Sequence, residues 1–164
     1  MDNIEIKEVK PEEISDLSKL ATSIVREHFD PLIGKEQNDY MLEKFQSVSA
    51  IKSQFEHGYN YFWVKSSNQN IGFLGFYKKD DKLCLSKFYL IKEQRGKKIS
   101  KKMMEFIVNY CKDNQLKSIF LNVNRNNIVP IKVYEHLGFK KIREEKNDIG
   151  SGFYMDDFVF EYNI

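Results

Sequence analysis

The fold is decided by the stretch Leu83-Cys-Leu-Ser-Lys-Phe-Tyr-Leu-Ile-Lys-Glu-Gln-Arg-Gly-Lys-Lys-Ile-Ser100. Its first half is mostly apolar or aromatic, which is typical of a buried strand. Directly after the stretch, apolar side chains recur at intervals of three and four residues, a spacing that predicts an amphipathic helix over 100–113. These side chains are Met103, Met104, Ile107, Val108 and Cys111. A strand therefore leads through a basic loop into the first turn of a helix.

Positive charge is concentrated around this loop. The whole chain has 26 Lys and Arg residues against 24 Asp and Glu residues, whereas residues 92–112 contain seven basic residues and two acidic ones. Lys97, Lys98, Lys101 and Lys102 lie at or just before the helix start, where the helix dipole disfavours cations by roughly a few tenths of a kcal/mol each. A bound phosphate would remove this cost, because exposed backbone N–H groups and the dipole together form an anion receptor. The competing interpretation is a solvated lysine face.

The loop does not match the common nucleotide-binding motifs. The P-loop needs G-x-x-x-x-G-K-(S/T) and the dinucleotide fingerprint needs G-x-G-x-x-G, and the single Gly96 supplies neither. This counts against a kinase and against a nicotinamide-dependent enzyme. Cys84 and Cys111 are far apart and the three histidines are scattered, so no zinc-binding spacing can be assembled. We therefore expect no metal and two reduced, buried thiols.

A second informative segment, residues 126–139, follows a predicted buried strand. It reads Asn126-Asn-Ile-Val-Pro-Ile-Lys-Val-Tyr-Glu-His-Leu-Gly-Phe139 and predicts a short helix over 128–137 that Gly138 ends. Asn127 and Tyr134 are seven residues apart, which is about two helical turns, so both lie on one face of that helix. Taken singly, Asn127 can be an ordinary N-cap and Tyr134 a half-buried core residue.

Together the two segments resemble the GCN5-related N-acetyltransferases, the GNAT family. The family's pyrophosphate loop has the pattern (Q/R)-x-x-G-x-(G/A), which Arg95-Gly-Lys-Lys-Ile-Ser100 occupies with Lys98 and Ser100 at the two glycine positions. The second segment is similar to the family's N-x-x-A-x-x-x-Y-x-x-x-G-F, with Pro130 at the alanine position. The closing stretch 148–158 is similar to a bacterial branch that includes the PaiA-like polyamine acetyltransferases.

The order of predicted elements agrees with this resemblance. It implies one N-acetyltransferase domain over 1–164, of α/β class, with a mixed, mostly antiparallel central sheet of about six to seven strands flanked by about four helices. Periodicity predicts strands over 4–9, 59–64, 71–77, 83–91, 118–123, 139–144 and 153–162. It predicts helices from residue 11 to about 25, around 40–48, and over 49–57, 100–113 and 128–137, with a loop over 28–34 and a turn over 148–152.

The resemblance also implies a chemistry and assigns residues to it. Acetyl-coenzyme A (acetyl-CoA) is the donor and a primary amine attacks it directly. The N–H of Phe88 would polarise the thioester carbonyl, the main chain of Leu90 would hold the pantetheine arm, and Tyr134 would donate its proton to the departing thiolate. The other implied CoA-binding residues are Arg95, Gly96, Lys97, Lys98, Ile99, Ser100, Lys101 and Asn127.

The acceptor side is less defined. Tyr40, Asp156 and Asp157 are candidate substrate contacts, because the acids would attract a cationic amine. Adjacent residues on a strand point to opposite faces, so at most one of the two acids should line the cleft. An alkylamine is protonated at neutral pH and must lose a proton before it attacks, and Glu27, His28 and Asp157 are candidate bases. The acceptor is expected to be a small molecule such as a polyamine, or a protein amine.

Two other functions stay open at this point. One is a weakly catalytic CoA-binding sensor, which the two replaced glycines favour. The other is a nucleic-acid-binding module that uses the basic residues of 92–112, although the aromatic residues lie in apolar strands and no RNP-like or helix-turn-helix motif is present. No apolar run approaches a membrane span, and the start of the chain lacks a signal-peptide core. We expect a cytoplasmic monomer or homodimer with no membrane or nucleic-acid partner.

Overall fold

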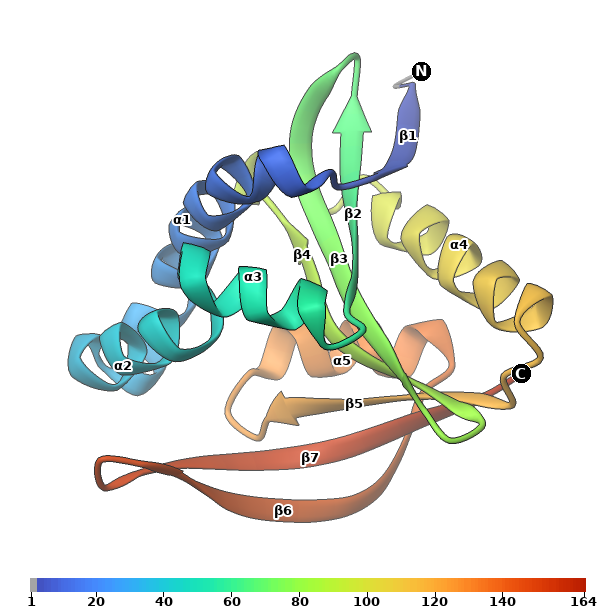
Figure 1. Ribbon diagram of the computed structural model, residues 1–164. Helices are drawn as coiled ribbons and strands as arrows, with labels where there is room; N and C mark the ends of the chain where they lie inside the picture. The colour runs from blue at the N-terminus through green and yellow to red at the C-terminus, as the bar shows by residue number, and fades with distance from the viewer. Residues whose placement is uncertain (1–2) are drawn as a thin grey trace.

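Seven strands form one sheet in the computed structural model, which describes residues 3–164 (Figure 1). Their spatial order is β1-β2-β3-β4-β5-β7-β6, with β4 and β5 parallel and the other neighbouring pairs antiparallel. The predicted mixed, mostly antiparallel sheet is therefore confirmed. The strands are β1 (Ile4–Glu8), β2 (Asn60–Ser66), β3 (Gln69–Lys79), β4 (Lys82–Leu90), β5 (Ser118–Asn124), β6 (Lys140–Gly150) and β7 (Phe153–Asn163).

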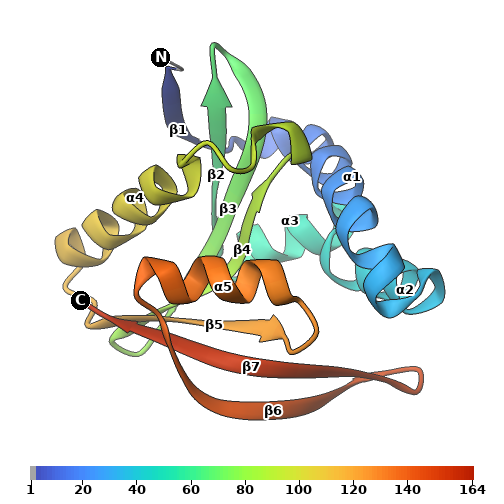
Figure 2. The same ribbon diagram turned by 180° about the vertical axis from the view of Figure 1, so that it is seen from behind.

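Helices cover both faces of this sheet. Figure 1 shows α1 and α3 in front of the strands, and Figure 2 shows α4 and α5 on the opposite side. The described residues form five α-helices: α1 (Ile14–Ile33), α2 (Lys35–Phe45), α3 (Val48–Glu56), α4 (Ile99–Asp113) and α5 (Ile128–Leu137). Two 3-10 turns, Pro11–Glu13 and Lys92–Gln94, precede α1 and the loop before α4. None of the helices described is long and apolar enough to cross a membrane.

The side chains of β3 explain why both faces are covered. Its residues 71–76 are all buried, and the adjacent side chains of Phe73 and Leu74 enter opposite cores. Phe73 packs with the α1 and α3 side, whereas Leu74 packs with the α4 side. On α4, Met103 and Ile107 are fully buried, as the helical spacing predicts. The two cysteines are free and buried, as expected from their positions in apolar elements.

The middle of the sheet is where β4 and β5 separate. Their parallel pairing is limited to Lys82–Cys84 opposite Ser118–Phe120. Beyond Cys84, β4 follows β3 while β5 follows β7 (Figure 1). A register shift in the β3–β4 pairing also places Ser86 opposite no residue of β3. The later part of β4 therefore has one edge that pairs with no other strand.

Three sequence expectations about element ends were wrong, and one of them is the helix expected around 40–48, which begins at Lys35 and ends at Phe45, with Val48 in α3. Residues 28–33 form the last turns of α1 and not a loop, although Pro31 removes one hydrogen bond of the helix. The helix ends at Gly34, whose φ of +88° is left-handed and whose N–H donates to Asp30 O at 3.1 Å. The strand expected over 139–144 continues to Gly150, so the turn is confined to Ser151 and Gly152. Most of this edge strand is exposed, so it has no apolar alternation to mark its length.

Candidate active site

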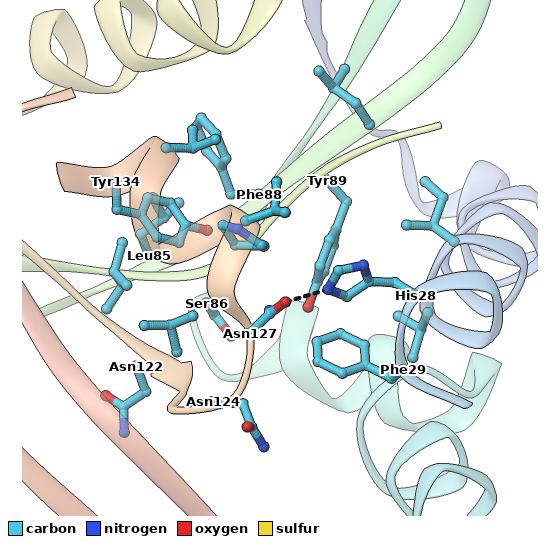
Figure 3. Close-up of a pocket in the computed structure, with 18 of the residues that line it drawn as sticks. His28, Phe29, Leu85, Ser86, Phe88, Tyr89, Asn122, Asn124, Asn127 and Tyr134 are labelled. Atoms are coloured by element: carbon cyan, nitrogen blue, oxygen red, sulfur yellow. Dashed lines mark hydrogen bonds between the residues drawn. The ribbon is translucent and has the colours of Figure 1, made fainter. Parts of the chain in front are cut away.

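A cavity of about 480 Å³ occupies the space where β4 and β5 separate. Its walls come from β4 and β5, from the start of α4, from α5 and from the C-terminal half of α1 with α2 and β7. Figure 3 shows side chains from these elements pointing toward one another across it. Two basic side chains, Arg95 and Lys98, line the cavity from the loop before α4, and α2 with the start of β7 contributes both apolar and polar side chains.

The free edge of β4 supplies main-chain groups to the cavity. Ile91 N–H donates to Ile71 O on β3 at 2.8 Å. Because N–H directions alternate along a strand, the N–H groups of Phe88 and Leu90 point to the opposite edge, the one that β5 leaves. The carbonyl of Leu90 points the same way, since it accepts hydrogen bonds from Arg95 Nε and Nη2 at 3.1 and 3.0 Å. Phe88 and Leu90 thus offer unpaired N–H groups beside the cavity.

The loop before α4 contributes the two basic side chains of the cavity wall. Arg95, Gly96, Lys98, Ile99 and Ser100 line the cavity. Lys98 has a φ of +63° and ψ of +17° and stands as the N-cap of α4. This left-handed conformation costs a non-glycine residue about 1–2 kcal/mol. Glycine adopts this left-handed conformation without that cost, and the family pattern has glycine at this position. Lys98 adopts the same conformation and lowers the free energy of unfolding by doing so.

Two predicted members of the loop and one predicted base lie outside the cavity wall. Among the described lining residues, Lys97 and Lys101 are absent, and both are exposed. Arg95 forms an ion pair with Glu27 at 3.1 Å, and Glu27 does not line the cavity either. This pair joins α1 to the loop at the rim.

Tyr134 reaches the centre of the cavity from α5 (Figure 3). Its ring packs on Phe88 and Phe139, with centroid distances of 5.9 and 5.7 Å. Within residues 3–164 no hydrogen bond from its hydroxyl to another side chain or to the backbone is found. Burial raises the pKa of this phenol above its ordinary value, so the hydroxyl stays protonated at neutral pH. It is a hydrogen-bond donor that faces open space next to the free β4 edge.

Asn127 is buried at the start of α5 but its side chain does not cap the helix. Its Oδ1 instead lies 2.5 Å from His28 Nε2 on α1 (Figure 3). In this pair His28 Nε2–H donates to the amide oxygen, which can only accept. The contact closes one wall of the cavity by joining α1 to α5.

Asp157 on β7 brings a carboxylate to the cavity. Its residue is 2% exposed, it lines the cavity, and its Oδ2 has no hydrogen-bond partner. Burial raises the pKa of this carboxyl to about 6, with the neighbouring acids adding to the shift. Tyr89 also lines the cavity, and burial together with Asp157 raises its pKa to about 12. Asp157 is therefore largely ionised at neutral pH and has an oxygen free to accept a hydrogen bond.

The other two predicted substrate contacts lie elsewhere. Asp156 does not line the cavity and pairs with Arg125 Nε at 2.8 Å, as alternation along β7 requires of one of the two acids. Tyr40 does not line the cavity either. Its hydroxyl donates to Ile149 O at 2.6 Å and thereby holds the β6–β7 hairpin against α2.

Sequence reasoning missed the apolar wall opposite the β4 edge. It is formed by Phe29, Met41, Phe45 and Met155, from α1, α2 and β7. Apolar periodicity in α1 and α2 would have revealed a buried face, but the same periodicity is typical of ordinary core packing. The assignment of these side chains to a cavity requires the relative placement of three elements that are distant in the sequence.

Comparisons with known proteins agree with this architecture. The model of the acetyltransferase (GNAT) family matches residues 22–139. A probable spermine N(1)-acetyltransferase of Bacillus subtilis subsp. natto (strain BEST195) is 30% identical over 63 residues, which cover 38% of this chain and 41% of that protein. The match thus spans less than half the length of this relative.

Solved structures show the same fold over the whole chain. A PaiA N-acetyltransferase from Thermoplasma acidophilum in complex with coenzyme A has a TM-score of 0.83 at 21% identity, with 99% of each chain covered. A GCN5-related N-acetyltransferase from Rhodopseudomonas palustris has a TM-score of 0.82 at 9% identity, with 100% of this chain and 98% of that one covered. At these identities the likeness establishes the fold.

Proposed function

The chain belongs to the GNAT family of acetyltransferases and is an acyltransferase, and from this premise we propose that it transfers acetyl from acetyl-CoA to the primary amine of a small molecule. The observation that carries the proposal is one cavity that is lined both by the β4 residues whose N–H groups have no partner strand and by a buried carboxylate, Asp157. A thioester and an amine can meet there, between groups that suit each of them.

The β4 edge and the basic loop fit the donor. Acetyl-CoA supplies a reactive acetyl thioester, a pantetheine arm with amide groups, and phosphates. In the proposal, Leu90 N–H binds the pantetheine arm, and the backbone of the loop from Arg95 to Lys101 binds the pyrophosphate at the start of α4. Phe88 N–H donates to the thioester oxygen as negative charge develops on it. Asn127 takes part through the wall that it forms with His28.

Asp157 is proposed to bind the amine and to accept its proton. An alkylammonium has a pKa near 10.4 and cannot attack until it is deprotonated. The free Oδ2 of Asp157 can hold the ammonium by a charge-assisted hydrogen bond and take one proton from it, and the neutral amine then attacks the thioester carbon. Tyr134 is proposed to donate a hydrogen bond to the sulfur that leaves, because its hydroxyl stays protonated beside Phe88.

The names of relatives support a small-molecule amine as acceptor. The matched curated relative is a probable spermine acetyltransferase, and one neighbour is a PaiA N-acetyltransferase with coenzyme A bound. Membership of a PaiA-like branch is therefore the proposal, together with acetyl-CoA as cosubstrate. A nucleic-acid-binding function has less support, because the aromatic rings Tyr61, Phe73 and Phe76 are buried in the two cores.

Acetyl-CoA is expected to stabilise the protein against thermal unfolding, and short DNA or RNA oligonucleotides are not. At about 100 times its Kd, a ligand that binds the folded state alone raises the free energy of unfolding by about 2.7 kcal/mol. Differential scanning fluorimetry with acetyl-CoA, coenzyme A and oligonucleotides measures the shift. A salt-dependent shift with oligonucleotides, and none with millimolar acetyl-CoA, would favour nucleic-acid binding instead.

A further inference from the structure

Resting on the proposed function, we propose that the acceptor is a monoamine with a short apolar alkyl or aryl body, and that the cavity discriminates against diamines and polyamines. Two features support this inference. The cavity is lined by one acidic side chain, and several of its other lining side chains are apolar.

The first observation is that the cavity has a single carboxylate. Of the described residues that line it, Asp157 is the one acidic side chain. Its buried Oδ2 has no partner, so it can pair with one ammonium group. The other charged side chains that line the cavity, Arg95 and Lys98, are cations, so the described lining offers no second acid to another ammonium.

The second observation is that neighbouring acids are already paired. Three acids flank lining residues on α1 and β7, and each forms an ion pair with an arginine. Glu27 pairs with Arg95 at 3.1 Å, Asp30 with Arg26 at 3.7 Å, and Asp156 with Arg125 at 2.8 Å. A second ammonium that paired with one of these three acids would have to displace its arginine.

The third observation is that four apolar side chains, Phe29, Met41, Phe45 and Met155, line the cavity from α1, α2 and β7, the last of which carries Asp157; the amides Gln37, Asn122 and Asn124, which carry no charge, line it as well. Figure 3 shows the Phe29 ring facing inward. An alkyl or aryl group would be buried favourably against these side chains. An ammonium placed among them would lose its hydration without gaining a counterion, which is strongly unfavourable.

Pentylamine and 1,5-diaminopentane form a matched pair for the test, because they share one carbon chain and differ by the second amino group. We expect kcat/KM for acetyl transfer to be at least tenfold higher for pentylamine, with phenethylamine also above spermidine. A diamine or polyamine that is acetylated as well as pentylamine, or better, would overturn the inference.

Met155→Glu adds a second carboxylate to the wall of the cavity. Met155 and Asp157 are two residues apart on β7 and both line the cavity, so the new carboxylate would stand about 6.6 Å along the strand from the first. This variant is expected to raise kcat/KM for 1,5-diaminopentane relative to pentylamine by at least tenfold. Met155→Gln, which has the same length without the charge, controls for the loss of the apolar side chain and should change this ratio far less than Met155→Glu. If both variants change the ratio equally, charge is not what selects the substrate.

A binding measurement separates this inference from the proposed function. Each amine is titrated into the protein loaded with coenzyme A, and the shift in melting temperature is recorded beside the acetylation rate. A shift with pentylamine and none with 1,5-diaminopentane supports the inference even if neither amine is acetylated, a result that would count against the proposed transfer. Acetylation of both amines at similar rates, or equal shifts with both, refutes the inference while leaving amine binding intact.

Discussion

Replacing Asp157 by Asn is expected to lower kcat/KM for the amine by about 10²–10⁴-fold, the range that a general acid or base contributes. The amide keeps the shape of the side chain but can neither pair with an ammonium nor accept its proton. In the native protein, kcat/KM should rise with pH through about 6, where the buried carboxyl ionises, and the variant should lose this step. Initial rates across pH 5 to 9 with a fixed amine measure both effects, and full activity of the variant would contradict the assignment.

The same substitution is expected to stabilise the fold, opposite in sign to its effect on activity. Burial raises the pKa of Asp157 from 3.8 to about 6, so the ionised carboxylate destabilises the folded state at neutral pH. The contribution of this carboxyl to the free energy of unfolding is fully present below about pH 4, where the group is protonated, and is lost as the pH rises through about 6. Asp157→Asn should therefore gain on the order of 1–3 kcal/mol at pH 8 and little at pH 4.

Glu161→Gln is the matched control for this prediction. Glu161 lies on the same strand, pairs with Lys82 at 2.9 Å and does not line the cavity. Its substitution should cost at most about 1 kcal/mol of stability through the lost ion pair and leave kcat/KM unchanged. Urea unfolding at two pH values separates the two variants. A loss of stability in Asp157→Asn would show that the carboxylate has a structural role.

Tyr134→Phe is expected to lower kcat by about 10²-fold or more, because it removes the hydroxyl that donates to the leaving sulfur and keeps the ring. The ring contacts with Phe88 and Phe139 remain, so acetyl-CoA affinity and melting temperature should change little. Steady-state rates, together with the melting temperature in the presence of acetyl-CoA, test this in one comparison.

Tyr110→Phe is the control for the loss of a phenol. Tyr110 lies on α4, packs on Phe76 in the same core, and does not line the cavity. Its substitution should leave kcat unchanged and cost at most about 1–1.5 kcal/mol of stability. A Tyr134→Phe variant with full turnover would show that the thiolate leaves unaided or that another donor serves it.

The parts of the fold that could be predicted from sequence are those with strong local signals. Helix α4 has a 3.6-residue apolar period, the basic loop before it is marked by a clear change of composition, and α5 is marked by its terminal glycine. Strand β6 could not be delimited, because an exposed edge strand needs no apolar alternation. The last turns of α1 were missed because Pro31 is normally a signal for the end of a helix.

The cavity was less predictable than the fold, for a physical reason. Main-chain donors of β4 could be placed, since alternation along a strand fixes their direction once one neighbour is known. Lys87 illustrates what could not be placed, because nothing in the apolar run of β4 shows that a lysine is buried. Its Nζ donates to Phe45 O at 2.8 Å and to Gln54 Oε1 at 3.2 Å, and burial lowers its pKa to about 7. These partners come from α2 and α3.

The most direct test of acetyl transfer follows both products of one reaction. The native protein is mixed with acetyl-CoA and pentylamine, and N-acetylpentylamine is measured by mass spectrometry while free coenzyme A is measured by thiol titration. The account predicts equal amounts of the two products, formed far faster than in buffer and far more slowly with Asp157→Asn or Tyr134→Phe. Binding of acetyl-CoA without formation of any acetylated amine, for pentylamine and for a broad set of other amines, would contradict it and identify the protein as a CoA-binding sensor.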